Sequence, residues 1–110
     1  MSEQVFSLDG KSVWVAGHRG MVGAALVRRL HSENCTILTA DRKQADLTRQ
    51  SEVDNWMAAN RPQVVFLAAA RVGGIHANNT QPAEFLYENL MIEANIIHAA
   101  HKSGVEKLVF

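Results

Sequence analysis

Short apolar runs alternate with longer segments of helical periodicity along almost the whole chain, and this alternation constrains the fold most. The runs typical of strands are residues 12–17, 35–40, 63–70 and 106–110, and the segments typical of helices are residues 21–33, 48–59 and 82–103. Strict alternation implies parallel strands joined by right-handed crossovers. The sequence therefore predicts an α/β fold, the first half of a Rossmann-like doubly wound parallel sheet.

The predicted helices carry apolar faces of different widths. The first two direct a narrow set of side chains inward, namely Val22, Leu26, Leu30, Val53, Trp56 and Met57. The third has a band wider than one sheet face, made of Leu86, Leu90, Met91, Ile92, Ile96 and Ile97. We therefore expect part of helix 82–103 to contact a second copy of the chain in a homodimer.

The last apolar run, residues 106–110, has no helical segment after it. A strand without its helix leaves one side of the sheet poorly covered, so residues 1–110 are expected to form one incomplete domain, which is either a fragment or is covered by something else. The first and fourth strands are expected to flank the topological switch point, where sheets of this type bind ligands.

Composition excludes several classes of protein. The chain has 110 residues, 47% hydrophobic and 20% charged, with 11 basic residues balancing 11 acidic ones, so neither nucleic acid nor an anionic membrane is an expected partner. No run approaches the roughly 18 apolar residues of a transmembrane helix, and the first twelve residues are not a secretory signal. A lone cysteine, Cys35, indicates a reducing cytoplasm and is expected to be buried in a strand.

Three glycines, Gly17, Gly20 and Gly23, directly follow the first predicted strand and open the first helix. In that context Gly17 can make the tight turn, Gly20 can bring bare backbone against a pyrophosphate, and Gly23 lets the helix approach the strand. The helix N-terminus would direct its N–H groups at the phosphates. The glycine spacing therefore predicts a dinucleotide-binding site.

The end of the second strand favours one form of the dinucleotide without excluding the other. Asp41 lies 18 residues after Gly23, where a carboxylate that accepts the ribose hydroxyls would select NAD. Arg42, Lys43 and Arg19 suit the 2′-phosphate of NADP, because guanidinium groups bind phosphate in a bidentate fork. An inward Asp41 would repel that phosphate, whereas an outward one would not. We favour NADP.

The chain resembles the GDP-L-fucose synthases, which are extended short-chain dehydrogenases/reductases with oxidoreductase and isomerase activity. The resemblance rests on "AGHRGMVG", "ADL", "FLAAARVGGIHANNTQPAEF" and "ENLMIEANIIHAAHKSGVEKLVF", and runs from about residue 12 to residue 110. The His18–Arg19 pair and the "RVGGIHANNTQPAEF" segment are the most specific parts. The resemblance implies an NADP(H)-binding N-terminal portion of an enzyme that makes GDP-L-fucose from GDP-4-keto-6-deoxymannose.

The resemblance also assigns expected contacts by position. The pyrophosphate would bind the loop Gly17, His18, Arg19, Gly20, Met21, Val22 and Gly23; the other expected cofactor contacts are Arg42 at the 2′-phosphate, Asp46 and Leu47 at the adenine, and Ala68 and Ala69 at the end of the third strand. Asn89 and Asn95 match asparagine positions on a helix of extended reductases. Asp41 departs from the expected pattern beside Arg42.

The catalytic residues of these reductases are not found in this sequence. They use a serine with Tyr-x-x-x-Lys, whereas the single tyrosine, Tyr87, is followed four residues later by Met91 and is expected to be a packing residue. His98 and His101 have no third partner at a suitable spacing, so no metal site is predicted. The loop at residues 71–81 would border the nicotinamide and sugar or simply connect elements. Another extended reductase, such as a sugar-nucleotide 4-epimerase, and a non-catalytic dinucleotide-binding module remain alternatives.

Overall fold

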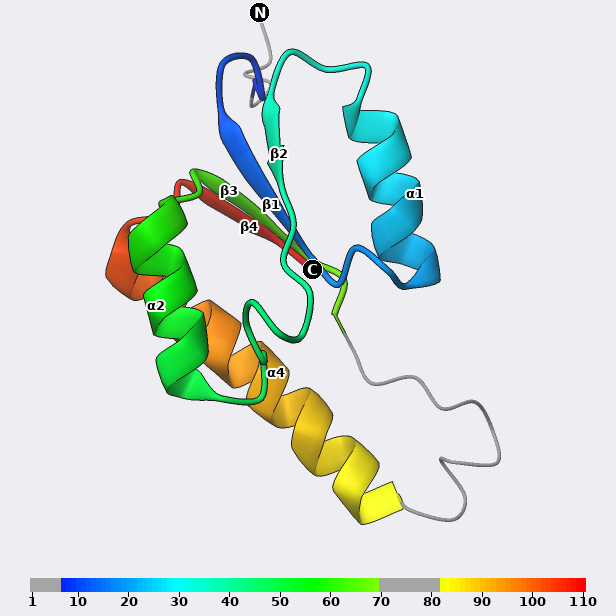
Figure 1. Ribbon diagram of the computed structural model, residues 1–110, viewed down its shortest axis with the longest axis vertical. Coiled ribbons are helices and arrows are strands. Elements are labelled where there is room, and N and C mark those ends of the chain that lie inside the picture. Colours follow the sequence, from blue (N-terminus) through cyan, green and yellow to red (C-terminus); the bar gives the residue numbers. More distant parts are fainter. Residues whose placement is uncertain (1–6, 70–81) are drawn as a thin grey trace, which may run out of the picture.

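The computed structural model describes residues 7–69 and 82–110, so the predicted loop at residues 71–81 lies outside the described residues. The described elements are β1 (Ser12–Ala16), α1 (Met21–Leu30), β2 (Thr36–Leu38), α2 (Gln50–Asn60), β3 (Val64–Leu67), α4 (Pro82–Ser103) and β4 (Lys107–Val109). Within these residues the strands all run parallel in one sheet of order β2-β1-β3-β4 (Figure 1). The predicted Rossmann-like alternation is confirmed.

The strand order corrects the predicted position of the switch point. β3, not β4, lies beside β1, with Val13 paired to Val64 and Ala16 paired to Leu67. The reason lies in α2, which packs across Trp14 of β1 rather than beyond β2 and so returns the chain on the far side of β1. The switch point is therefore between β1 and β3.

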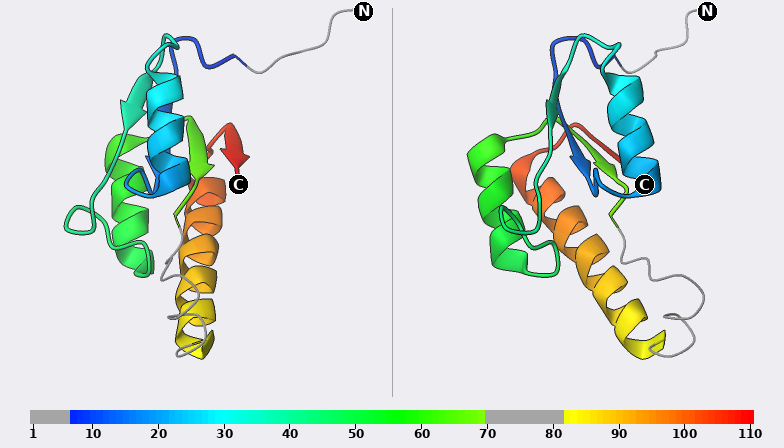
Figure 2. Two further views of the ribbon diagram at one scale, coloured as in Figure 1. Left: turned by 90° about the vertical axis from the view of Figure 1, so that its right-hand side faces the viewer. Right: turned by 45° about the vertical axis from the view of Figure 1, so that its right-hand side comes forward.

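Helices cover both faces of the sheet, with α1 on one face and α2 and α4 on the other (Figures 1 and 2). Because successive strand residues point to opposite faces, Val13 and Val15 pack in the cluster that includes α1, while Trp14 and Ala16 pack toward α2 and α4. The apolar runs of β1 and β3 therefore serve two cores, as expected of strands buried on both faces.

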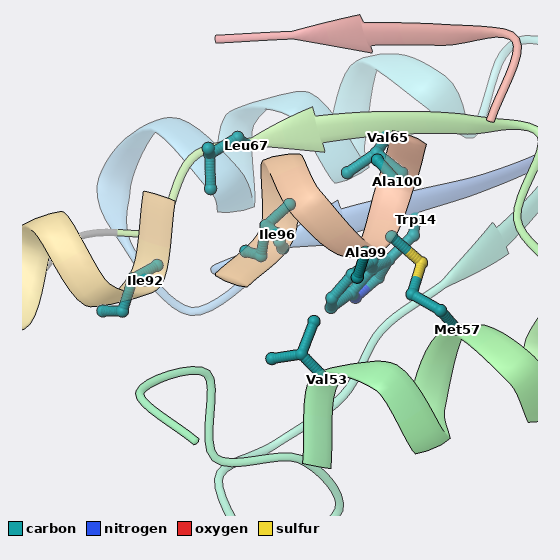
Figure 3. Close-up of a cluster of buried hydrophobic side chains, with 10 residues drawn as sticks. Trp14, Val53, Met57, Val65, Leu67, Ile92, Ile96, Ala99 and Ala100 are labelled. Atoms are coloured by element: carbon teal, nitrogen blue, oxygen red, sulfur yellow. The ribbon is translucent and has the colours of Figure 1, made fainter. Parts of the chain in front are cut away.

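The larger core lies between the sheet and the pair α2 and α4 (Figure 3). Its buried side chains are Trp14, Ala16, Val53, Met57, Val65, Leu67, Ile92, Ile96, Ala99 and Ala100. Trp56 packs against this cluster, with its ring centroid 5.8 Å from that of Trp14. The predicted inward face of α2 is thus confirmed.

The α1 side of the sheet is smaller than the sequence predicts. Leu30 is buried and Leu26 packs beside it, but Val22 is 63% exposed, so its predicted place in the core is wrong. Val22 lies in the first turn of α1. The helix ends at Leu30 rather than residue 33, because the N–H groups of Ser32 and Glu33 bond the carbonyls three residues back in a tight turn.

Cys35 lies just before β2 and is half-buried, so its predicted position inside a strand is wrong. Its Sγ lies 3.9 Å from the carbonyl oxygen of Leu30. Burial, and the charge of Glu33, raise the pKa of this thiol.

Two surfaces of the described residues carry uncovered apolar groups. On the α1 face of β3 and β4, Phe66 and Val109 are only half-buried, which agrees with the poor coverage expected there. On α4, whose N-terminal half extends beyond the sheet, Leu86 and Tyr87 are exposed (Figures 1 and 2). The predicted packing role of Tyr87 is wrong, since it is 64% exposed. None of the described helices is long and apolar enough to span a membrane.

Candidate functional site

The turn between β1 and α1 lies at the carboxyl end of the sheet, beside the end of β3 (Figure 1). Gly17 has a φ of 91°, which glycine adopts without strain, and its carbonyl oxygen accepts the N–H of Gly20 at 3.2 Å. A Cβ on Gly17 would lie 2.5 Å from the Cα of Ala69. Position 17 therefore requires glycine for two reasons: the turn has a positive φ there, and the end of β3 leaves no space for a side chain.

Gly23 is required by packing and Gly20 is not. A Cβ on Gly23 would overlap the carbonyl oxygen of Gly17 and lie 2.7 Å from its carbonyl carbon, so a larger residue would push α1 away from the turn. Gly20 has φ −72° and ψ 168°, open to any residue, and its Cβ would meet only the Gly17 oxygen, at 3.6 Å. Nothing in the described fold explains a glycine at position 20.

The N-terminus of α1 has no internal partner for its first N–H groups. Gly20 is the N-cap and offers no side-chain hydrogen bond, and the first turn of this fully described helix contains no acidic residue. The N–H groups of Met21, Val22 and Gly23 therefore lack an intrahelical acceptor, and the positive end of the helix dipole stands unneutralised. Such an end is suited to bind an anion.

A cleft of about 810 Å³ opens at the carboxyl ends of β1, β2 and β3, in front of this helix end. All the cofactor contacts predicted from the sequence line it except Gly23, which is buried behind Gly17: Gly17, His18, Arg19, Gly20, Met21, Val22, Arg42, Asp46, Leu47, Ala68 and Ala69. The cleft is also lined by residues that the sequence analysis did not select: Ala40, Ala45, Thr48, Glu88 and Ile92. Glu88 and Ile92 belong to α4, and no local pattern signals that α4 reaches the cleft.

A smaller hollow of about 420 Å³ adjoins the cleft and is lined by Arg19, Asp41, Arg42 and Lys43. The Arg19 guanidinium lies 4.0 Å from Oδ2 of Asp41. Three cationic side chains around one carboxylate leave the hollow with a net positive charge. Its chemistry suits a phosphate group.

Asp41 is engaged with the turn that follows it. Its Oδ1 accepts the N–H of Gln44 at 2.9 Å, and its own N–H donates to Oε1 of Gln44 at 2.8 Å. The sequence left open whether the Asp41 carboxylate points toward the cofactor. In the structure it accepts a hydrogen bond from the turn that follows it, and Asp41 lines the hollow.

Asp46 orders the next segment of the cleft wall. Its Oδ1 accepts both the hydroxyl of Thr48, at 2.7 Å, and the N–H of Thr48, at 3.1 Å. The Thr48 hydroxyl, then its N–H and the charges of Arg42 and Arg49, hold the pKa of Asp46 below its usual value, although burial opposes the shift. Nε of Arg42 lies 3.7 Å from Oδ2 of the same carboxylate. Asp46 is thus ionised at neutral pH and shapes the turn that presents Leu47 to the cleft.

Asn95 ties α4 to this segment. It is 5% exposed, and its Nδ2 donates to the carbonyl oxygen of Leu47 at 2.9 Å. A buried side-chain amide that satisfies a backbone carbonyl is costly to remove. The resemblance marked this position, and the structure places Asn95 behind the cleft wall, outside the set of residues that line the cleft. Among residues 7–69 and 82–110, no group of three histidine, cysteine or carboxylate side chains is placed to hold a metal ion.

Comparison with known proteins agrees with this geometry. Residues 13–110 match the model of the NAD dependent epimerase/dehydratase family. The chain is 55% identical over 106 residues to a GDP-L-fucose synthase of Sinorhizobium fredii, covering 96% of this chain and 34% of that protein. It is 50% identical over 104 residues to the GDP-L-fucose synthase of Escherichia coli, covering 94% of this chain and 32% of that protein. The resemblance to GDP-L-fucose synthases is confirmed.

Solved structures of other sugar-nucleotide reductases have a similar fold. A GDP-mannoheptose C4 reductase from Campylobacter jejuni, solved with NADP bound, superposes with a TM-score of 0.85 at 38% identity, covering 92% of this chain and 32% of that one. A dTDP-4-dehydrorhamnose reductase from Bacillus anthracis, solved in complex with NADP, has a TM-score of 0.80 at 26% identity, covering 92% and 35%. The chain spans about a third of the length of the curated relatives that it matches.

Proposed function

Because this chain belongs to the NAD dependent epimerase/dehydratase family, we propose that its cleft binds NADP(H). In this proposal the chain is the N-terminal, cofactor-binding portion of a sugar-nucleotide epimerase/reductase similar to GDP-L-fucose synthase. One observation carries the proposal: the uncapped N-terminus of α1 faces an open cleft whose neighbouring hollow is cationic. A pyrophosphate and a 2′-phosphate need these two features side by side.

The turn at residues 17–23 would hold the pyrophosphate. Gly20 leaves the N–H groups at the start of α1 uncovered, and Met21 and Val22 supply the wall of the cleft there. Ala68 and Ala69, at the end of β3, line the same cleft, and their small side chains leave room for a ligand in front of the turn. His18 lines the same cleft.

The adenosine end would lie toward β2. Arg19 and Arg42 would bind the 2′-phosphate as a pair of guanidinium groups, with Lys43 adding charge at the outer side of the hollow. Asp46 and Leu47 would lie beside the adenine, with Leu47 as its apolar contact. Arg42 is 86% exposed at its side chain and its contact with Asp46 is long, so it can turn toward a phosphate at little cost.

The activity of the whole protein is a further part of the proposal. Bound NADPH would supply a hydride, which we place at C4 of an epimerised GDP-4-keto-6-deoxy sugar, in the reaction that gives the GDP-L-fucose synthases their name. In that reaction this chain would bind the dinucleotide and fix its orientation at the sheet edge. Residues 1–110 would form one incomplete NAD(P)-binding domain, working in the cytoplasm.

We also propose that α4 contributes to a homodimer. Leu86, Tyr87, Leu90 and Ile97 are exposed on this helix, by between 40% and 64%. Leu86, Leu90 and Ile97 belong to the apolar band of this helix and Tyr87 follows Leu86 in the chain, whereas Ile92 and Ile96 of the same band lie in the core.

A substitution at Gly20 tests the cofactor proposal with two readouts of opposite sign. In Gly20→Asp, the carboxylate can cap the free N–H groups of α1, which should stabilise the chain by about 0.5–1 kcal/mol. The same carboxylate occupies the groups that a pyrophosphate needs and repels its charge. We expect at least a tenfold weaker affinity for NADP⁺ in calorimetric titration, together with a higher melting temperature.

Ala25→Asp is the matched control, because Ala25 is exposed on the same helix and does not line the cleft. It adds the same charge without a cap, so the affinity for NADP⁺ should change by less than about twofold. Unchanged affinity in Gly20→Asp, with the protein folded, would contradict the pyrophosphate assignment.

A further inference from the structure

We infer that Asp41 promotes NADP binding, despite its negative charge, because it caps the turn that carries the phosphate-binding cations. In this role Asp41 is a positioning residue that acts through Arg42 and Lys43. The inference rests on the proposed function and names a residue that sets the cofactor preference of the same site. Charge alone gives the opposite expectation, namely that Asp41 selects against the 2′-phosphate.

Four hydrogen bonds define what Asp41 does. Its side-chain Oδ1 accepts the N–H of Gln44 at 2.9 Å, and Oε1 of Gln44 accepts the N–H of Asp41 at 2.8 Å. Its carbonyl oxygen accepts the N–H groups of Gln44 and Ala45, both at 3.0 Å. This reciprocal pattern is a capping box, with the cap and its partner three residues apart. Asp41 and Gln44 therefore close a single turn on themselves.

The two residues inside that box are the ones that a phosphate would use. Arg42 and Lys43 lie between Asp41 and Gln44 in the chain, and both line the cationic hollow. Ala45, directly after the box, is 2% exposed and anchors the turn in the protein. A turn that is ordered before the ligand arrives spares the entropy of fixing its backbone upon binding. The box thus preorganises two cations at the hollow.

The charge of Asp41 is already compensated in this arrangement. Oδ1 is directed into the turn, and the Arg19 guanidinium lies 4.0 Å from Oδ2. A carboxylate that selects NAD would instead direct its oxygens at the ribose hydroxyls. Here Oδ1 accepts the Gln44 N–H and Oδ2 lies near Arg19. These contacts favour a capping role for Asp41 over a role as a ribose ligand.

Two substitutions at position 41 separate the cap from the charge. Asp41→Asn removes the charge and keeps a side-chain oxygen for the Gln44 N–H, whereas Asp41→Ala removes both. We expect Asp41→Asn to bind NADP⁺ at least as tightly as the original chain. We expect Asp41→Ala to bind NADP⁺ about three- to tenfold more weakly than the original chain, and therefore also more weakly than Asp41→Asn, on the scale of a lost helix-type cap. The affinity for NAD⁺ should differ by less than about twofold between the two variants, because NAD⁺ has no 2′-phosphate for Arg42 and Lys43 to bind.

Gln44→Ala tests the other half of the box with the carboxylate still in place. It should also weaken NADP⁺ more than NAD⁺, because the turn loses its bond to the Asp41 N–H. Asp9→Asn is the control for charge alone, since Asp9 is an exposed carboxylate elsewhere in the described chain, bonded to Asn34. Arg42→Ala is the positive control for loss of the phosphate contact.

The measurement is calorimetric titration of the whole chain with NADP⁺ and with NAD⁺, with thermal melts to check folding. Equal NADP⁺ affinity in Asp41→Asn and Asp41→Ala would show that only charge matters and would overturn the inference. Loss of NAD⁺ binding in both variants would identify Asp41 as a ribose ligand and would also overturn it. If the original chain binds neither dinucleotide, the proposed function itself fails.

Discussion

At the scale of single residues, the glycine loop contains three positions with three different physical requirements. Gly17 needs a positive φ and contact with Ala69, and Gly23 needs space beside the Gly17 carbonyl. Gly20 needs neither, since its backbone angles suit any residue. Because the fold does not require glycine at position 20, the close approach of a bound ligand can explain why a glycine is found there.

This distinction predicts different stabilities for two alanine variants. Gly23→Ala should lower the free energy of unfolding by about 1–3 kcal/mol, because a methyl group overlaps the Gly17 carbonyl and α1 must shift. Gly20→Ala should change it by less than about 1 kcal/mol, the usual scale for an N-cap position. Urea denaturation of both variants measures the difference, and equal losses would contradict the packing role of Gly23.

At the scale of elements, α2 ends on an unusual residue. The sequence predicts a helix over residues 48–59, and in the structure the helix ends one residue later, at Asn60. The next residue, Arg61, has φ 45° and ψ 58°, the left-handed conformation that usually belongs to glycine, and its N–H donates to the Met57 carbonyl at 2.8 Å. The helix end is therefore satisfied in hydrogen bonding but strained in backbone.

Relief of that strain gives a prediction for α2. Arg61→Gly should raise the free energy of unfolding by about 0.5–1 kcal/mol, because glycine adopts the left-handed region freely. Asn55→Gly, at an exposed position inside the same helix, should lower it by about 0.5–1 kcal/mol. Thermal melting followed by circular dichroism compares them. A lower melting temperature for Arg61→Gly would contradict the strain argument.

At the scale of the whole molecule, the sheet buries only part of what α4 offers. Ile92 and Ile96 complete the larger core, while Leu86, Leu90 and Ile97 remain exposed on the same helix. A long helix with two apolar faces needs a second surface to cover the outer one. The proposed homodimer supplies that surface from a second copy of the chain.

The proposed dimer predicts how oligomeric state responds to charge. Leu90→Glu places a carboxylate on the exposed face of α4 and should convert dimers to monomers at micromolar concentration, with the helical content retained. Ala25→Glu, on α1, should leave the mass unchanged. Light scattering after size-exclusion chromatography measures both. A monomeric original chain, or a dimer that persists in Leu90→Glu, would contradict the assignment to α4.

The sequence alone determined the order and type of the elements and most, but not all, of the residues that line the cleft. These depend on neighbours close in the chain: alternation of apolar runs, a glycine turn after β1, and cations after β2. Boundaries moved by a few residues, as at the end of α1, where a tight turn replaced the last helical turn.

Only the tertiary structure decided which distant segments meet. It placed β3 rather than β4 beside β1, exposed Val22 and Tyr87, and brought Glu88 of α4 into the cleft. It also directed the Asp41 carboxylate into its own turn, a matter of side-chain rotamer that the residue order leaves open. The physical reason is the same throughout: periodicity records which face of an element is apolar, whereas packing across the sheet selects the partner that covers it.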